Sequence, residues 1–443
     1  MKALNQSILS TMNSQFIADP KNRMAMDAVT KNGIDATACN YNAARRLQHQ
    51  FSITVDDGTV TNQKRSGRCW LFSSLNVARS LAKKNLNLDE FEFSQAYAMY
   101  FDKLERTNYF LQDMADLLRQ GEPIDGQLIQ YQLGNVMGDG GQWTMAMNIY
   151  KKYGAVPKSF FPETASSENT AMMNTQLKHL LHKCVMEMAK ASSDDEIEQI
   201  ITSGIEDAHR LLTIHLGNPP ENIDWEWTDK DGEFHRAGTM TPQEFWNTYV
   251  GDSLDEYICL IDDPRHDHPK GQKIAIEHLG NIVDGDPTEY LNVDIQTMKD
   301  CVRRILSEKN IPVWFGADCH PFMDRIGGSW SLDLFDYKGI YNSDFTMSKE
   351  DRVCFGDSAM NHAMAFVGVN VLEDGTTNRW RVENSWGSDI AHKGYFTMDD
   401  DWFTEYVYEV AVPKSMLSEE LQKALEKPAI SLPAWDPMGA LAE

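Results

Sequence analysis

The sequence has no long apolar run, no closely spaced pair of cysteines and no extended basic segment. No window approaches the length of a membrane span, and the opening residues, MKALNQSILSTMNSQF, lack the apolar core of a secretory signal. We therefore expect a cytoplasmic protein with no membrane partner. The seven cysteines are an odd number and are widely scattered, which favours reduced thiols over a disulfide framework.

Basic residues are also scarce, and this excludes another class of partner. The 443 residues include 41 Lys and Arg against 66 Asp and Glu, a net charge of −25. Basic side chains occur at most in pairs such as Lys83-Lys84 and Arg303-Arg304. A surface of this charge repels phosphate backbones, so we expect no nucleic acid partner. The length exceeds one typical core, so two or three packed units are expected.

The segment QKRSGRCWLFSS contains the candidate nucleophile, Cys69. Apolar residues recur after it at three- and four-residue spacing, the pattern of a helix with one buried face: Leu71, Leu75, Ala78 and Ala82. Cys69 would then lie at a helix N-terminus, where the dipole and unpaired N–H groups favour a thiolate. The alternative is a buried, inert cysteine.

Gln63 precedes Cys69 by six residues and is a candidate oxyanion donor. Its amide N–H, together with the backbone N–H of Cys69, is placed to stabilise the negative charge that develops during acyl transfer.

Two later stretches supply partners for the thiol. NHAMAFVGVNV places His362 at the start of an apolar strand, and RWRVENSWG places Asn384 near the end of a second strand after the turn-prone EDGTTN. A hairpin would return Asn384 to the same end as His362. There His362 would deprotonate the thiol and later protonate the leaving amine, while the Asn384 amide would hold the imidazole in the required tautomer.

These residues carry a resemblance to the papain-type cysteine proteases. The matching positions are Gln63, Cys69-Trp70, His362 and Asn384-Ser385-Trp386-Gly387. Papain-like enzymes usually place the His about 130–150 residues after the Cys, so roughly 150 residues have been inserted here. That length, with KLERTNYFLQ, GDGGQW and the ending AWDPMGALAE, resembles the bleomycin hydrolase and bacterial aminopeptidase C family over essentially the whole chain.

The resemblance implies an active-site cleft with several substrate contacts. Gly140 and Gly141 would line it and bind the substrate backbone, since glycine has no Cβ to block close approach. Trp386 would belong to the same binding region. The C-terminal arm would lie in the cleft, with the carboxylate of Glu443, or of Ala442 after self-trimming, facing the substrate's α-ammonium. The resemblance also implies a cysteine aminopeptidase without a cofactor, made without an inhibitory pro-segment and assembled as a homohexamer.

The expected fold class is α+β, a papain-like fold with a helical half, a β-barrel-like half, a large and mostly helical insertion, and terminal arms. The expected divisions are an N-terminal arm with one helix that wraps the body (1–62), the helical half (63–165), an insertion for subunit contacts (166–300), the β-rich half (301–412) and a C-terminal helix and arm (413–443).

Within these divisions, local patterns predict particular elements. Helices are expected in 94–118, after Gly141, in TQLKHLLHKCVMEMAKA, in SSDDEIEQIITSGIEDAHRLLTIHL and in KSMLSEELQKALEK. IDWEWTDKDGEFHRAG predicts a hairpin, and Thr241-Pro242-Gln243-Glu244 has the form of a capping box.

Two further stretches suggest chemistry that we do not favour. DDPRHDHPK offers Asp262, Asp263, His266 and His268 as metal ligands, but it is bounded by proline and lacks the spacing of a zinc site, so a solvated loop without metal is expected. Cys319 and His320 are adjacent on an apparent strand and would point to opposite faces.

Two alternative functions remain open at this stage. One is an endopeptidase of the same family with a differently placed tail, which the ending AWDPMGALAE disfavours. The other is a non-catalytic ring that binds peptides or nucleic acid, which the intact set of Gln63, Cys69, His362 and Asn384 disfavours.

Overall fold

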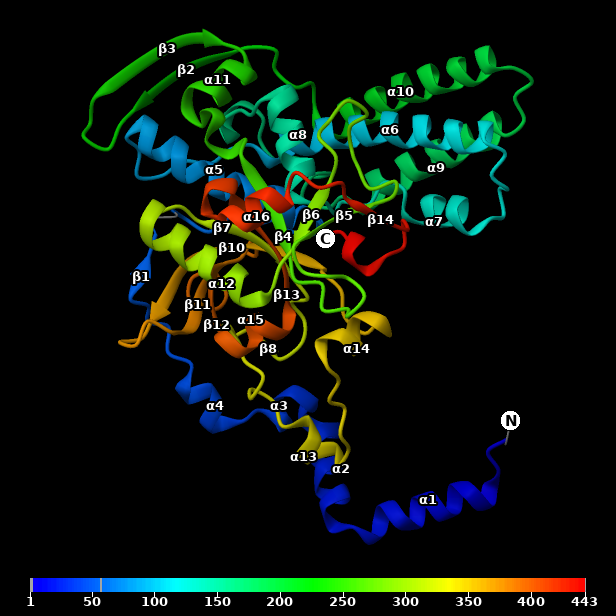
Figure 1. The fold of residues 1–443 in the computed structure, drawn as a ribbon, viewed down its shortest axis with the longest axis vertical. Coiled ribbons are helices and arrows are strands. Elements are labelled where there is room, and N and C mark those ends of the chain that lie inside the picture. The colour runs from blue at the N-terminus through cyan, green and yellow to red at the C-terminus, as the bar shows by residue number, and fades with distance from the viewer. Residues whose placement is uncertain (1–2, 56–57, 443) are drawn as a thin grey trace.

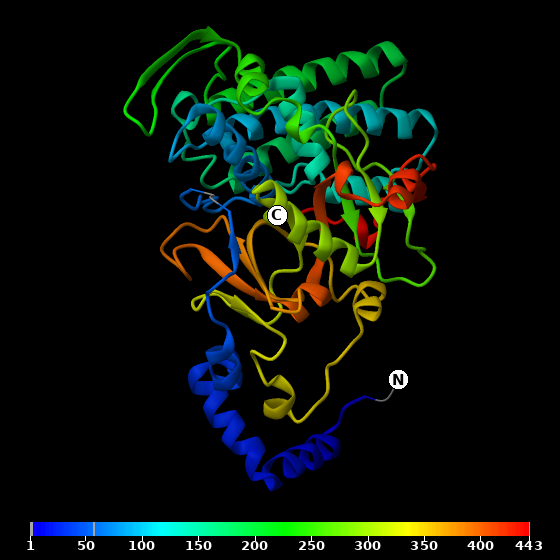
Figure 2. The same cartoon turned by 60° about the vertical axis from the view of Figure 1, so that its left-hand side comes forward.

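The computed structural model describes residues 3–55 and 58–442. Its first four helices form an arm that extends from one end of the body (Figures 1 and 2): α1 (Gln6–Ala18), α2 (Pro20–Asn32), α3 (Ile34–Ala38) and α4 (Tyr41–Arg46). The expectation of one helix wrapped around the body is therefore wrong. Capping residues divide the segment, because Asp19 caps α2 with Pro20 at its first position, and Gly33 follows it at φ 83°. Neither α1 nor α2 has a buried residue.

The helical half lies on one side of the sheet (Figure 1). The helix that carries Cys69 is central to it and packs against strand β10. The elements of this half and of the following segment are α5 (Cys69–Leu86), α6 (Gln95–Arg119), α7 (Gln127–Asn135), α8 (Trp143–Tyr153), η1 (Lys158–Phe160), α9 (Ala171–Met188), α10 (Asp194–Leu216), α11 (Pro242–Tyr249) and η2 (Gly251–Leu254). The helices expected in these stretches are confirmed. The capping box is also confirmed, since Thr241 and Glu244 each accept from the other's backbone N–H.

Strands within the described residues form one large mixed sheet and one separate hairpin. The hairpin joins β2 (Ile223–Thr228) to β3 (Phe234–Met240), as expected. The order in the sheet is β14-β5-β6-β4-β13-β7-β10-β11-β12-β9-β8, with β1 on β10. Its strands are β1 (Ile53–Thr54), β4 (Tyr257–Ile261), β5 (Gln272–Ile276), β6 (Glu289–Asn292), β7 (Val313–Ala317), β8 (Met323–Asp324), β9 (Ser329–Trp330), β10 (His362–Val371), β11 (Thr377–Glu383), β12 (Tyr395–Asp399), β13 (Val407–Pro413) and β14 (Ile430–Leu432).

Short helices cover the edges and ends of this sheet: α12 (Ile295–Arg304), η3 (Ile305–Lys309), α13 (Tyr337–Tyr341), α14 (Lys349–Cys354), α15 (Asp400–Tyr406), η4 (Lys414–Met416), α16 (Glu419–Ala424) and η5 (Pro437–Gly439). The single helix expected after Val412 is wrong, because Leu417 is extended and Ser418 caps a new helix, α16.

Two large apolar clusters hold the molecule together. One fills the helical half and includes Trp70, Trp143 and Trp314, and the other fills the space around β7, β10, β11 and β13. Cys69 and Ala363 belong to the first cluster, and Met364 and Ala365 belong to the second. The start of β10 therefore lies where the two halves meet, and this is where the candidate site is found. No helix within the described ranges is both long and apolar enough to cross a bilayer.

Candidate active site

Cys69 is the first residue of α5 and is fully buried. Arg68 precedes the helix, and its guanidinium binds Glu163 at 2.8 Å, which fixes the turn that leads into the nucleophile. The backbone N–H of Ala363 points at Cys69 Sγ across 3.4 Å. That contact places the beginning of β10, and hence His362, beside the thiol. The helix N-terminus and a backbone donor both favour negative charge on sulfur.

His362 and Asn384 meet as the hairpin predicted. β10 begins at His362, β11 ends at Glu383, and the two strands pair antiparallel. His362 Nε2 lies 2.9 Å from Asn384 Oδ1, with both side chains buried. Because a carbonyl oxygen only accepts, Nε2 carries the proton and Nδ1 is left as the basic nitrogen. Asn384 Oδ1 also accepts from the N–H of Ser385 at 2.8 Å, which holds the amide in this orientation.

Trp386 stacks on the imidazole of His362, with ring centroids 5.1 Å apart and planes inclined by 27°. Arg325 lies over the same indole at 4.5 Å. This packing shields the His362–Asn384 hydrogen bond from water, which strengthens it. The structure thus places Trp386 against the histidine.

Gln63 is buried and is tied to both halves of the site. Its backbone N–H donates to Ser385 O at 2.9 Å, and its Oε1 accepts from Ser385 Oγ. Its Nε2 donates to Ser66 O at 2.5 Å. An amide nitrogen has two hydrogens, so one donor orients the side chain and the second is available to another acceptor.

Asp139 is a site residue that the sequence reasoning missed. Its carboxylate accepts from Gly67 N–H at 3.0 Å, pairs with Lys103 at 2.8 Å and accepts from Asn174 at 2.7 Å. Its backbone carbonyl accepts from Trp70 Nε1 at 2.7 Å. Although burial opposes it, the charge of Lys103 holds the pKa of Asp139 well below its usual range. Asp139 therefore joins the loop before the nucleophile to the glycine pair that follows it, and its place in GDGGQW was the available signal.

Gly140 and Gly141 lie next to the nucleophile helix. Gly140 O accepts from Arg106 at 2.6 Å, and Arg106 lies over the Trp70 ring at 5.5 Å. A Cβ added at Gly141 would come within 2.5 Å of the Trp70 indole, so only glycine fits there. Gly141 N–H donates to Ala442 O at 3.2 Å, in an isolated antiparallel bridge.

The C-terminal segment thus occupies the backbone donor that was expected to bind substrate. Gln142 Nε2 donates to Ala440 O at 2.8 Å, and Ala442 is fully buried. Glu443, the other candidate for the terminal carboxylate, lies outside the described residues.

The loop 262–270 is only partly the solvated loop that its composition suggested, because its residues 266, 267, 269 and 270 are exposed whereas Asp262 and Asp263 are buried. Asp263 is fully buried and binds Arg265 and His268 at 2.8 and 2.6 Å, while Lys270 and Lys349 both bind Asp262. The expectation failed for Asp262 and Asp263 because both have basic partners, which lets a carboxylate be buried. Among the described residues, no group of three or more His, Cys, Asp and Glu side chains is arranged to hold a metal ion.

The other buried cysteines are poor nucleophiles. Burial raises the pKa of Cys301 to about 11 and also raises those of Cys184, Cys259 and Cys319. Cys319 is buried whereas His320 is exposed, so these neighbours point in different directions. Both follow the end of β7.

The fold and this arrangement of side chains define a papain-like cysteine peptidase. The model of the Peptidase C1-like family matches residues 3–439, and the chain belongs to this family. It is 39% identical to human bleomycin hydrolase and 36% identical to aminopeptidase C of Lactobacillus delbrueckii subsp. lactis, in both cases over at least 99% of each protein. The solved structure of PepW from Lactobacillus rhamnosis superposes with a TM-score of 0.95 at 38% identity, over 99% of both chains.

Proposed function

We propose that this protein is a cytoplasmic cysteine aminopeptidase that removes N-terminal residues from short peptides with broad side-chain tolerance. The observation that carries this proposal is the bridge between Gly141 N–H and Ala442 O. A substrate chain extending past the nucleophile on that side would need the same backbone donor. Because the protein's own tail holds it, only a peptide whose chain ends near Cys69 fits.

The proposed chemistry uses a Cys69–His362–Asn384 set. His362 Nδ1 takes the thiol proton, and the Cys69 thiolate attacks the scissile carbonyl carbon, forming a C–S bond. Gln63 Nε2 and the N–H of Cys69 stabilise the resulting oxyanion. The imidazolium then protonates the leaving amine as the C–N bond breaks, and water, deprotonated by His362, hydrolyses the thioester to free the N-terminal amino acid.

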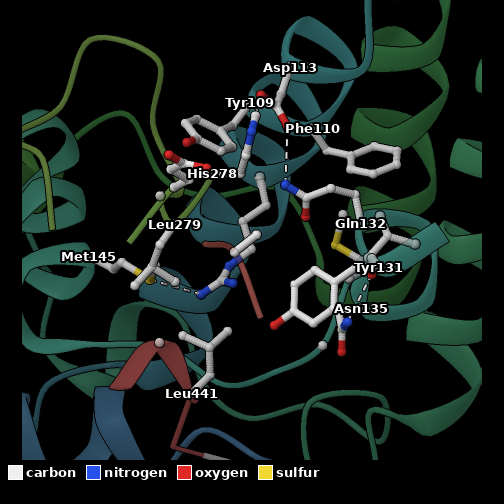
Figure 3. Close-up of a pocket in the computed structure, with 18 of the residues that line it drawn as sticks. Tyr109, Phe110, Asp113, Tyr131, Gln132, Asn135, Met145, His278, Leu279 and Leu441 are labelled. Atoms are coloured by element: carbon white, nitrogen blue, oxygen red, sulfur yellow. Dashed lines mark hydrogen bonds and ion pairs between the residues drawn. The ribbon is translucent and has the colours of Figure 1, made fainter. Parts of the chain in front are cut away.

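The terminal carboxylate of the tail is proposed to select the substrate's free amine. Ala440 and Leu441 border a cavity of about 390 Å³ whose other walls include Tyr131, Asn135 and His278 (Figure 3). The bond between Ala442 and Gly141, which packs on Trp70 next to Cys69, supports placing a carboxylate at residue 442 or 443 opposite the α-ammonium of a bound substrate. An ion pair at a site shielded from water discriminates strongly.

The arms and the insertion support a proposal on assembly. Apolar side chains on α1 and α2 are exposed, for example Met12 at 55% and Met24 at 73%. We infer that this arm and residues 166–300 contact other subunits, in the homohexamer that the family resemblance implies.

The discriminating experiment compares an aminoacyl fluorogenic substrate with its N-acetylated form. We expect the free amine to be cleaved and the acetylated compound to be refused. Equal cleavage of both would favour an endopeptidase, and binding without any cleavage would favour a non-catalytic peptide-binding ring.

A further inference from the structure

The C-terminal arm carries one charged residue between Lys427 and its last residue, and that residue is Asp436. Its carboxylate forms a two-point contact with Arg265, with Nη1–Oδ2 and Nη2–Oδ1 distances of 2.8 Å each. Both side chains are largely removed from solvent, at 12% exposure for Arg265 and 7% for Asp436. A bidentate, partly buried pair of this kind is the strong form of ion pair and fixes geometry as well as distance.

Arg265 is itself held in place. Its Nε and Nη2 bind the fully buried carboxylate of Asp263 at 2.9 and 2.8 Å, and His268 Nδ1 lies 2.6 Å from the same carboxylate. Asp263 N–H donates to Asn292 Oδ1 at 3.1 Å, on strand β6 of the main sheet. The guanidinium is therefore held against the sheet by contacts that do not involve the arm.

The segment from Asp436 to Ala442 is short and stiff. Asp436 caps η5 by accepting from Met438 N–H at 2.9 Å, and Pro437 restricts the first turn. A Cβ at Gly439 would meet Ile276 at 2.9 Å, so the turn packs closely on β5. Ala440 and Ala442 follow with their bonds to Gln142 and Gly141. A displacement at Asp436 would be transmitted to the end of the tail.

The last residues are packed only in part, because Met438 and Ala442 are buried whereas Ala440 and Leu441 are half-buried. Ala440 and Leu441 border the cavity of about 390 Å³, with Leu441 facing Tyr131 and Asn135 across it (Figure 3). Upstream, β14 adds only Ile430–Leu432 to the edge of the sheet. Besides the buried side chains of Ala434, Met438 and Ala442, the described part of the arm has a short strand before Asp436, two backbone-carbonyl contacts after it and one ion pair between them.

We propose that the Asp263–Arg265–Asp436 relay is the clamp that fixes the register of the tail in the cleft, and so determines how strictly the enzyme requires a free N-terminus. Arg265 and Asp436 are positioning residues that act through the tail. This role rests on the proposed aminopeptidase function, because it concerns the same cleft.

The test is Asp436→Asn. Asparagine is as good a helix cap as aspartate, so η5 keeps its start, and Asp263 keeps Arg265 as its partner. The exposed surface pair Arg46–Asp333, 68% and 69% exposed, gives the matched control Asp333→Asn. Substituting Arg265 is less suitable because it would leave Asp263 buried without its guanidinium.

We expect Asp436→Asn to raise KM for an aminoacyl substrate about tenfold, the effect of losing one charge-assisted contact, with kcat changed less than about twofold. Cleavage of the N-acetylated substrate should rise by a similar factor. Hydrogen exchange of residues 434–442 should accelerate in Asp436→Asn and stay at the wild-type rate in Asp333→Asn.

A truncation that ends at Pro433 separates this clamp from the function it serves. If the truncated enzyme accepts N-blocked substrate and Asp436→Asn behaves as wild type in KM and in exchange, the clamp is overturned while the tail keeps its role. If the truncated enzyme still refuses N-blocked substrate, the tail is not the specificity element. In that case unchanged exchange of 434–442 in Asp436→Asn overturns the clamp, and faster exchange supports it as an anchor of the arm.

Discussion

The two ends of the chain are similar in composition but differ in burial. Each is a short segment in which a few apolar residues stand among small and polar ones. Yet α1 and α2 contribute no buried residue, whereas the C-terminal end places Ala442 at 0% exposure. The body offers the C-terminal arm an edge strand, a fixed guanidinium and the N–H of Gly141. It offers α1 and α2 nothing comparable.

A terminal segment is held in place by the binding groups that the body presents to it, and not by its own secondary-structure propensity. Where such groups exist, even a segment of this composition buries Ala434, Met438 and Ala442. Where they do not, exposed apolar side chains remain for another molecule to cover: Leu9, Met12, Phe16, Ile17, Met24 and Met26.

The largest expected effect comes from replacing Cys69, the proposed nucleophile. Cys69→Ser should lower kcat by at least about 10³-fold with an unchanged melting temperature, because a serine hydroxyl ionises far less readily than a thiol. Intact mass adds a second readout. Wild type should lack one or more C-terminal residues through self-trimming, and Cys69→Ser should keep the full-length mass. Equal masses would contradict self-trimming, and the role of Cys69 would then be tested by the loss of kcat alone.

The next prediction distinguishes the contribution of Gln63 and Asn384 to the reaction rate from the contribution of the tail to specificity. Gln63→Ala should lower kcat by about 10²–10³-fold, the usual loss for one oxyanion donor. The ratio of free-amine to N-acetylated cleavage should not change, because the tail is intact. Asn384→Ala should be milder, since Asn384 orients His362 without touching the substrate. Steady-state kinetics on both substrates would show the pattern, and a greater loss for Asn384→Ala would reverse these two roles.

The N-terminal end should respond in assembly and much less in chemistry. Deleting residues 1–32 removes α1 and α2, and we expect a smaller assembly by analytical ultracentrifugation, with kcat on a small aminoacyl substrate within about threefold of wild type. The matched control replaces the exposed Lys21 on α2 by Ala, which keeps the apolar side chains. An unchanged number of subunits per assembly would contradict a role of this arm in holding subunits together.

The smallest expected effect is a pH dependence at the base of the N-terminal arm. His49 stacks on His392 with ring centroids 4.1 Å apart and meets Thr397 Oγ1 at 2.9 Å. Burial first, and then the charges of His392 and Arg381, lower the pKa of His49 to about 4 from its usual 6.5. The folded state therefore prefers neutral His49, and this stabilisation is complete above pH 6.5 and is lost as pH falls toward about 4.

His49→Phe keeps the ring packing and cannot be protonated. Between pH 7 and 4.5 its melting temperature should fall less than that of wild type, by a difference on the order of 2 °C. Identical falls would show that His49 does not titrate in this range. The C-terminal clamp should not weaken between pH 7 and 4.5. Burial raises the pKa of Asp263, but hydrogen bonds from Arg265 and His268 outweigh it and lower that pKa, so Asp263 keeps its charge over this range.

Much of the site could be predicted because its chemistry is local in the sequence. Apolar spacing predicted that α5 begins at Cys69, and turn chemistry predicted that a hairpin brings His362 and Asn384 together. The loop 262–270 was partly misjudged although Arg265 and His268 are close to Asp263 in the sequence, because other partners come from far along the chain, Asn292 for Asp263 and Lys349 for Asp262. Asp139 was missed for the same reason, since Lys103 and Gly67 reach it only after folding. Contacts between side chains that are far apart in the sequence leave no periodic pattern from which they could be predicted.

The carboxylate of Asp139 has a consequence for the redox chemistry of the enzyme. A thiol peptidase needs a reducing environment to keep its nucleophile from being oxidised, and such an environment also breaks strained disulfides. The seven cysteines all lie within the described residues and none of them forms a disulfide, and the loop before Cys69 is joined to the glycine pair through oxygen and nitrogen atoms. Glutathione or dithiothreitol can therefore restore the thiol of Cys69 without breaking any bond that holds the loops around it. Reducing conditions that keep Cys69 active do not destabilise the cleft.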